Sequence, residues 1–168
     1  MRIVDGRRAT KRVAAAGMIA VIGYAVLAGL QIPVLNPRYA VPGKDLAAIG
    51  RDLDAAGESM QPGYTFAVLG LGVALALLTF VVLTRRSDAT ARAALVAYLV
   101  MLVFGAPAYF VASFAPGMAL ADTYMISGAD YSPWSVPLYA VSGLAIVALL
   151  GVAVHATRRR GTLQESHS

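Results

Sequence analysis

Residues 93–114 read AALVAYLVMLVFGAPAYFVASF, and this stretch decides the fold. It contains no charged residue and a single proline, Pro107. A helix that crosses the hydrocarbon core of a bilayer needs about 20 apolar residues, each adding about 1.5 Å of length. The stretch is therefore long enough to span a membrane as one helix.

Three further apolar stretches of similar length accompany it, so the sequence predicts an all-α integral membrane protein. We expect a single membrane domain over residues 1–168, folded as an antiparallel four-helix transmembrane bundle with a short amphipathic outer helix between spans 1 and 2. The turn at 85–92 is short, which makes its two helices antiparallel neighbours. The predicted spans are 13–32, 64–84, 93–114 and 136–156. The predicted outer loops are 33–63 and 115–135, and the predicted cytoplasmic segments are 1–12, 85–92 and 157–168.

The composition supports this class and argues against others. Hydrophobic residues make up 58% of the chain and charged residues 14%, whereas soluble domains carry about 25% charge. The net charge of +5 comes from basic residues beside the spans, so topology explains it and no nucleic-acid partner is expected. The chain has no cysteine, which excludes disulfides and thiolate metal sites. Abundant alanine and arginine with little lysine is typical of a GC-rich bacterium.

The first apolar run, 13–32, follows a basic arm and ends at Pro33. Such a start also occurs in signal peptides, but their apolar part usually has about 7–15 residues. The longer run favours an uncleaved span that ends at the proline.

The basic residues also predict the orientation. The segments 1–12, 85–92 and 157–168 hold eleven of the fourteen Lys and Arg residues, and the opposite side holds Arg38, Lys44 and Arg51. Six of the nine acidic residues lie on that opposite side. The positive-inside rule therefore places both termini in the cytoplasm of a cell-membrane protein.

Within the first outer loop, Asp45 to Met60 has the pattern of an amphipathic helix. Apolar residues recur at spacings of three and four, and Asp45 lies where an N-cap is expected. Two interpretations remain open: a lid or docking surface over the bundle, or a connector on the membrane surface. If the stripe is a docking surface, its candidate interaction residues are Leu46, Ile49 and Leu53.

The second outer loop is rich in aromatic residues. Tyr and Trp rings settle at the headgroup level of a bilayer, and they are also enriched at binding hot spots. We therefore add Tyr124, Tyr131 and Trp134 to the candidate interaction surface. Trp134 is the best single anchor, whether for lipid headgroups or for a partner.

Inside the spans, two features concern packing. Pro107 removes a backbone hydrogen bond and is expected to kink the third span, as a hinge or as a plain packing feature. Glycines let helix backbones approach closely, either within the monomer or against another membrane subunit. The candidate helix-packing residues are Gly17, Gly23, Gly29, Gly143 and Gly151.

The sequence contains few residues that indicate a catalytic or ligand-binding function. No Asp, Glu, Lys or Arg lies in the core of a predicted span, and His155 sits alone at a helix end, so no haem pair or proton relay is expected. Asp122 and Asp130 are only a weak candidate for an acid/base pair or cation site. Other polar residues in the predicted spans include Tyr24, Gln31, Thr79, Tyr98, Tyr109, Ser113 and Ser142. Ser and Thr can return their hydroxyls to the backbone of their own helix.

These observations predict no catalytic residue, no cofactor and no metal. The leading hypothesis is a non-enzymatic subunit that lies in the lipid bilayer and assembles with itself or with a partner membrane protein. The alternative is a carrier or pore for a small apolar or lipid-like molecule. A third hypothesis is a lipid-acting enzyme at the outer face.

Overall fold

The computed structural model describes residues 2–165, with side chains for residues 6–158. Every regular element in this range is a helix, and four helical segments are long and apolar enough to cross a membrane. They pack together as the predicted four-helix bundle, which confirms the fold class and implies residence in a lipid bilayer. The spans cover Gly6–Ala40, Pro62–Arg85, Ala91–Tyr124 and Ser135–Arg158.

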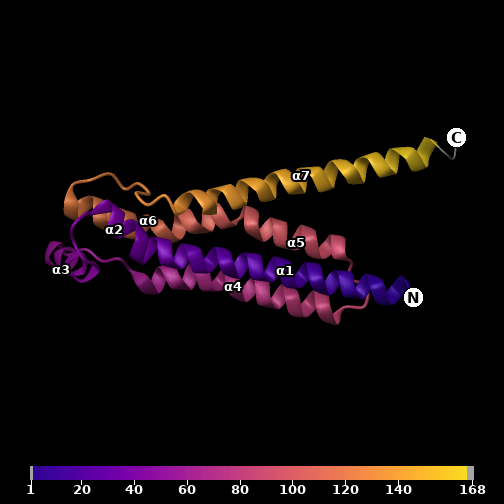
Figure 1. Cartoon of the computed structure of the whole chain (residues 1–168), viewed down its shortest axis with the longest axis horizontal. Coiled ribbons are helices and arrows are strands. Elements are labelled where there is room, and N and C mark those ends of the chain that lie inside the picture. The colour runs from indigo at the N-terminus through magenta and orange to yellow at the C-terminus, as the bar shows by residue number, and fades with distance from the viewer. Residues whose placement is uncertain (1, 166–168) are drawn as a thin grey trace.

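The long helices run side by side along the bundle, and both termini lie at the same end (Figure 1). We call this the terminal end, formed by residues 2–12, 85–92 and 152–165, and the opposite end the α3 end, formed by residues 31–62 and 121–135. The helices are α1 (Arg2–Leu30), η1 (Gln31–Leu35), α2 (Asn36–Ala40), α3 (Leu46–Ala56), α4 (Pro62–Arg85), α5 (Ala91–Val103), α6 (Gly105–Tyr124) and α7 (Ser135–Glu165).

The first span is longer than the sequence predicted, at both ends. The expected basic arm at 1–12 is helical from Arg2, and Pro33 does not end the helix, since η1 and α2 carry it on to Ala40. The turn at η1 is a π-helix, in which the N–H of Asn36 bonds to the carbonyl of Gln31. This wider turn lets the chain pass Pro33, which has no N–H to donate. Pro37 then opens α2, at a position where a missing N–H costs nothing.

The amphipathic outer helix is present as α3, with the predicted N-cap. The Asp45 carboxylate accepts a hydrogen bond from the Ala48 N–H at 2.6 Å. The helix ends at Gly57, whose φ of +77° is a left-handed conformation that glycine adopts without strain. Residues 58–60, which the pattern had included, lie beyond this cap.

The third span differs most from its predicted limits. It is divided at Phe104 into α5 and α6, and α6 continues to Tyr124 rather than stopping at Phe114. The expected loop 115–135 is therefore reduced to residues 125–134. The extension is stabilised because Ala119 and Leu120 of α6 pack against Ile49 and Leu53 of α3.

Pro116 lies inside α6, where proline is normally costly. Its missing N–H frees the carbonyl of Ala112, four residues earlier. The Thr65 hydroxyl of α4 donates to that carbonyl at 3.0 Å in a buried position. A neighbouring helix thus satisfies the freed group, which is how spanning helices tolerate proline.

The helices differ in how they pack against their neighbours. α1 packs against both α4 and α5, whereas α7 packs mainly against α5 and α6. In Figure 1, α7 starts beside α6 and moves away from the other helices toward its C-terminal end. The fourth helix is therefore anchored at the α3 end and open at the terminal end.

Candidate functional site

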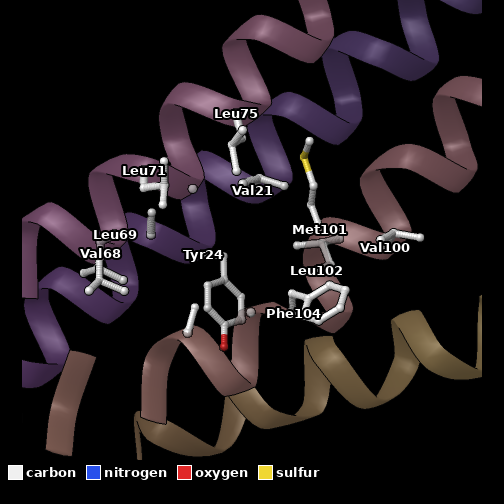
Figure 2. Close-up of a pocket in the computed structure, with 14 residues that line it drawn as sticks. Val21, Tyr24, Val68, Leu69, Leu71, Leu75, Val100, Met101, Leu102 and Phe104 are labelled. Atoms are coloured by element: carbon white, nitrogen blue, oxygen red, sulfur yellow. The ribbon is translucent and has the colours of Figure 1, made fainter. Parts of the chain in front are cut away.

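A cavity of about 310 Å³ lies between α1, α4 and the junction of α5 with α6. Its walls are apolar, and Figure 2 shows them contributed by several helices. Leu71 and Phe104, which line it, are 62% and 64% exposed. The cavity therefore opens sideways, toward the surface that faces the bilayer. The main lining residues are Val21, Tyr24, Leu71, Leu75, Met101 and Phe104.

The break between α5 and α6 shapes one wall of this cavity. Gly105 follows the break and lies directly against Tyr24, since a Cβ at this position would come within 2.8 Å of the tyrosine Cζ. The Tyr24 ring faces the cavity while its hydroxyl points away from Leu71 and Leu75 (Figure 2). Gly72 has no atom within 4 Å of its hypothetical Cβ, so the opposite wall leaves room for a ligand.

Ser142 of α7 is inserted into the backbone ladder at this break. Its Oγ accepts the Ala106 N–H at 3.0 Å and donates to the Leu102 carbonyl at 2.8 Å. Those two backbone groups would bond each other in an unbroken helix. A serine in a span can return its hydroxyl to its own helix, but Ser142 instead bridges two turns of a neighbouring helix, because α7 crosses α5 where the backbone hydrogen bonds are interrupted.

Pro107 lies on the exposed surface of α6, three residues after the break. A proline cannot bond the carbonyl four residues earlier, which here belongs to Val103, the last residue of α5. The interruption thus falls where the proline removes a bond.

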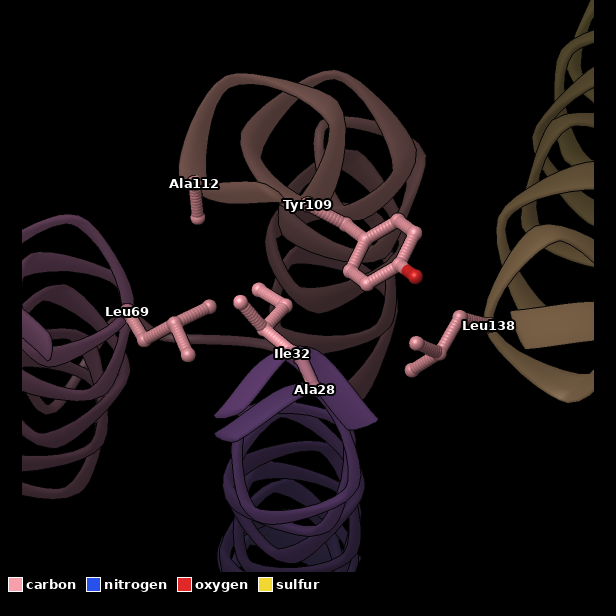
Figure 3. Packing of buried hydrophobic residues seen from close by; sticks show 6 residues of the cluster. All are labelled: Ala28, Ile32, Leu69, Tyr109, Ala112 and Leu138. Atoms are coloured by element: carbon pink, nitrogen blue, oxygen red, sulfur yellow. The ribbon is translucent and has the colours of Figure 1, made fainter. Parts of the chain in front are cut away.

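A second polar group lies toward the α3 end. The Tyr109 and Tyr139 hydroxyls donate to the two carboxylate oxygens of Asp130, at 2.6 and 3.0 Å. The tyrosine rings meet edge to face at 5.6 Å. Tyr109 is fully buried, and its ring packs with Leu138 and Ile32 (Figure 3). This arrangement ties α6, α7 and the 125–134 connection together, so Asp130 acts as a structural acceptor for two tyrosines.

The side chain of Gln31, at the start of η1, is buried, and its amide group makes no hydrogen bond. Its amide lies near the Tyr109 hydroxyl, but neither its Nε2 nor its Oε1 makes a bond of acceptable geometry. Since Tyr109 donates its only proton to Asp130, it has none for Gln31 Oε1. The Tyr24 hydroxyl is also buried near Ser142 without a bond of acceptable geometry. These are uncommon features, because buried polar groups are normally paired.

The candidate interaction residues are mostly engaged within the chain. Ile49 and Leu53 are buried against α6, and Leu46 is half-buried. The Tyr124 hydroxyl donates to Asp52 at 2.7 Å, and the Tyr131 N–H donates to Asn36 Oδ1 at 2.7 Å. Trp134 is 50% exposed. The structure thus brings the two outer segments together, with α3 against the end of α6, and leaves the Trp134 side chain exposed.

The candidate packing glycines fall into two groups. Gly17 faces Tyr98, whose Cγ would lie 2.3 Å from a Cβ at this position, and Gly29 is in ordinary contact range of Phe66. At Gly23, Gly143 and Gly151 a Cβ would meet nothing within 4 Å. Gly17 therefore serves packing within the monomer, whereas the two α7 glycines lie on a free surface.

Sequence reasoning recorded Tyr24, Gln31 and Ser142 only as polar residues in spans. Their roles depend on what neighbouring helices place beside them, which periodicity does not report. One signal was available: each proline in a span frees a carbonyl four residues earlier. For Pro116 this points to Ala112, and the partner was a threonine in another span.

Among the residues described, no group of three or more His, Cys, Asp or Glu is arranged to hold a metal ion. The apolar cavity beside Tyr24 has room for a ligand. Comparison of the chain with protein families, with curated proteins and with solved structures finds no match.

Proposed function

We propose that this chain is a non-enzymatic membrane protein that binds a lipid-like molecule in the cavity between α1, α4 and the α5–α6 junction. The observation that carries the proposal is an apolar space of about 310 Å³ that opens toward the bilayer. Ligand sites commonly have volumes of about 300–1,000 Å³ and mostly apolar walls. A hydrocarbon chain enters such a site directly from the membrane, without crossing water.

The α5–α6 break supports a carrier rather than a static binder. It forms the cavity wall at Phe104 and Gly105, and Ser142 takes the place of a regular backbone bond there. Exchange of that hydroxyl bridge for a direct Ala106–Leu102 bond would straighten the helix at the cavity. The ligand-bound and ligand-free forms of the protein would then differ in backbone conformation at the α5–α6 break.

The test uses a long alkyl chain that carries a photoreactive diazirine, added to the full chain in membranes. In Gly72→Phe, the new ring projects from the cavity wall and should abolish labelling of residues 100–108. Ala74→Phe is the matched control, since Ala74 is exposed on the same helix and does not line the cavity. Equal labelling of both variants and the parent would refute the proposal.

A second candidate is a membrane subunit that assembles through α7. The specific observation is that Gly143 and Gly151 share one face of this helix and have open space above them, as close contact with another helix requires. Trp134, at the start of α7, would extend the contact to the headgroup level. This candidate keeps the leading hypothesis from the sequence, which is a non-enzymatic subunit that assembles with itself or with a partner membrane protein.

Cross-linking of the protein in its own membrane tests this candidate. Gly143→Leu with Gly151→Leu should remove a cross-linked dimer or partner complex, and Trp134→Ala should weaken it. Leu53 is unsuitable for such a test because it is buried, so a polar residue there would disturb folding. An unchanged pattern in the double glycine variant would exclude assembly through this face.

We also propose that the terminal end faces the cytoplasm, on the charge distribution alone. Tags at either terminus should then be accessible only from the cytoplasmic side. A C-terminal reporter that is active solely outside would contradict this orientation.

A further inference from the structure

A second recess, separate from the apolar cavity, lies between the start of α5 and the last third of the α7 span. It is a groove of about 420 Å³ lined by Arg92, Ala148, Gly151, Val152 and His155. Two basic side chains stand at its edge, and small apolar residues form the rest. No acidic residue lines it.

The Arg92 guanidinium is already positioned across this groove. Its Nη2 donates to the Val152 carbonyl at 3.2 Å, which links α5 to α7. A guanidinium has five N–H donors in a planar fork that matches phosphate geometry. Arg92 is exposed, so its other donors remain open to a ligand.

His155 and Gly151 share one face of α7 with Ala148 and Leu144, because residues at spacings of three and four line up on a helix. A Cβ at Gly151 would meet nothing within 4 Å, and Leu144 is 68% exposed. This face therefore offers an open apolar track that leads from the two basic side chains toward the middle of the membrane.

The surroundings are electropositive as well. The terminal end carries eleven of the fourteen Lys and Arg residues. The nearest acid in the α4–α5 turn, Asp88, is already paired with Arg86 at 3.0 Å. The groove thus keeps its positive charge, at the level where lipid headgroups lie.

We propose that this groove binds one anionic phospholipid, with the phosphate between Arg92 and His155 and an acyl chain along Gly151, Ala148 and Leu144. Basic pockets between helices near the membrane surface hold anionic headgroups in this way. The lipid would cover the open part of α7 and hold it near α5. This site is independent of the carrier proposal, since it lies elsewhere and has a charged edge.

The test measures lipid retention by the full chain, purified in mild detergent, by native mass spectrometry and by thermal shift. Phosphatidylglycerol should remain bound as one molecule and raise the Tm. Phosphatidylcholine and inorganic phosphate should do neither. Equal effects of phosphatidylcholine, or a full Tm shift by inorganic phosphate alone, would overturn the proposal.

Variants locate the site. Arg92→Gln combined with His155→Gln should reduce retained phosphatidylglycerol at least several-fold. Gly151→Leu should do the same without changing the charge, by filling the track. Arg85→Gln is the control, since it removes an equivalent charge from an exposed residue outside the groove, leaves the Arg86–Asp88 pair intact and should retain the lipid. Retention by both groove variants at the parental level would refute the site, and the Tm without lipid shows that each variant is folded.

Discussion

The two ends of the bundle are built differently. At the α3 end, side chains cross-link separate segments: Asp130 joins Tyr109 and Tyr139, Asn36 Oδ1 accepts the N–H groups of Tyr131 and Ser132, and Asp52 accepts from Tyr124. At the terminal end, side chains bond to backbone carbonyls of other segments: Thr10 donates to the Ala89 carbonyl and Arg92 to the Val152 carbonyl.

The difference follows from where the chain places its loops. Both long connections lie at the α3 end, so their polar residues are available to tie helices together there. The terminal end has only the short 86–90 turn, which joins α4 to α5 and leaves α7 without a connection. A membrane bundle has no hydrophobic effect between its helices, so side-chain bonds such as that from Arg92 to the Val152 carbonyl contribute to holding α7 at the terminal end.

The largest effect should come from a matched pair of leucines on α7. Leu138 is 1% exposed in the core at the α3 end, and Leu150 is 62% exposed at the terminal end. Leu138→Ala should destabilise the protein by about 2–3 kcal/mol, toward the low end for buried leucines because the unfolded side chain meets lipid instead of water. Leu150→Ala should stay within about 0.5 kcal/mol. Thermal denaturation in detergent measures both, and equal losses would mean that the terminal end is as tightly packed.

A pair of glycines compares the close contact between α1 and α5 with the open face of α7, at the level of the backbone. Gly17→Ala places a Cβ against the ring carbons of Tyr98, and should cost about 1–2 kcal/mol through overpacking. Gly151→Ala meets open space, and should be neutral or slightly stabilising because alanine favours helix. The measurement is again the Tm in detergent. A tolerated Gly17→Ala would show that α1 and α5 can separate freely.

Two buried side-chain amides at the α3 end differ in their hydrogen bonding. The amide of Asn36 accepts hydrogen bonds, and the amide of Gln31 makes none. Asn36→Leu should cost about 1 kcal/mol or more, since the N–H groups of Tyr131 and Ser132 lose their acceptor. Gln31→Leu should leave the Tm unchanged or raise it, because the amide makes no hydrogen bond to offset its burial. A marked loss in Gln31→Leu would indicate that an internal water or ligand satisfies this amide.

The smallest expected effect is the response of helix α3 to low pH. Hydrogen bonding from Lys44, and next from Tyr124, lowers the pKa of Asp52 below its usual value. A lowered folded-state pKa means that the stabilising contact is complete above the unfolded value of about 3.9 and is lost as the pH falls through the lower folded value. The protection factors of the α3 amides, which correct exchange rates for the intrinsic effect of pH, should therefore fall at low pH. The fall should be absent in Asp52→Asn and retained in Asp54→Asn, and an identical acid response of the two variants would contradict it.

Several features could be predicted from the residues alone. The four spans follow from apolar length, and the start of α3 follows from Asp45, because a cap depends on a few neighbouring residues; the end of α3 was predicted at Met60, beyond its actual cap at Gly57. Hydropathy and capping are local properties, so a single sequence reports them well.

Other features were decided only by the tertiary structure. Pro33 was expected to end the first span, yet the helix passes it by a π-turn, and α6 passes Pro116 with the help of the Thr65 hydroxyl. Gly17 and Gly151 look alike in the sequence, but only Gly17 faces a tyrosine ring. The cavity beside Tyr24 and the bridge made by Ser142 likewise require three helices to meet. In each case the energy depends on which atoms another span places opposite, and that partner is distant in the sequence.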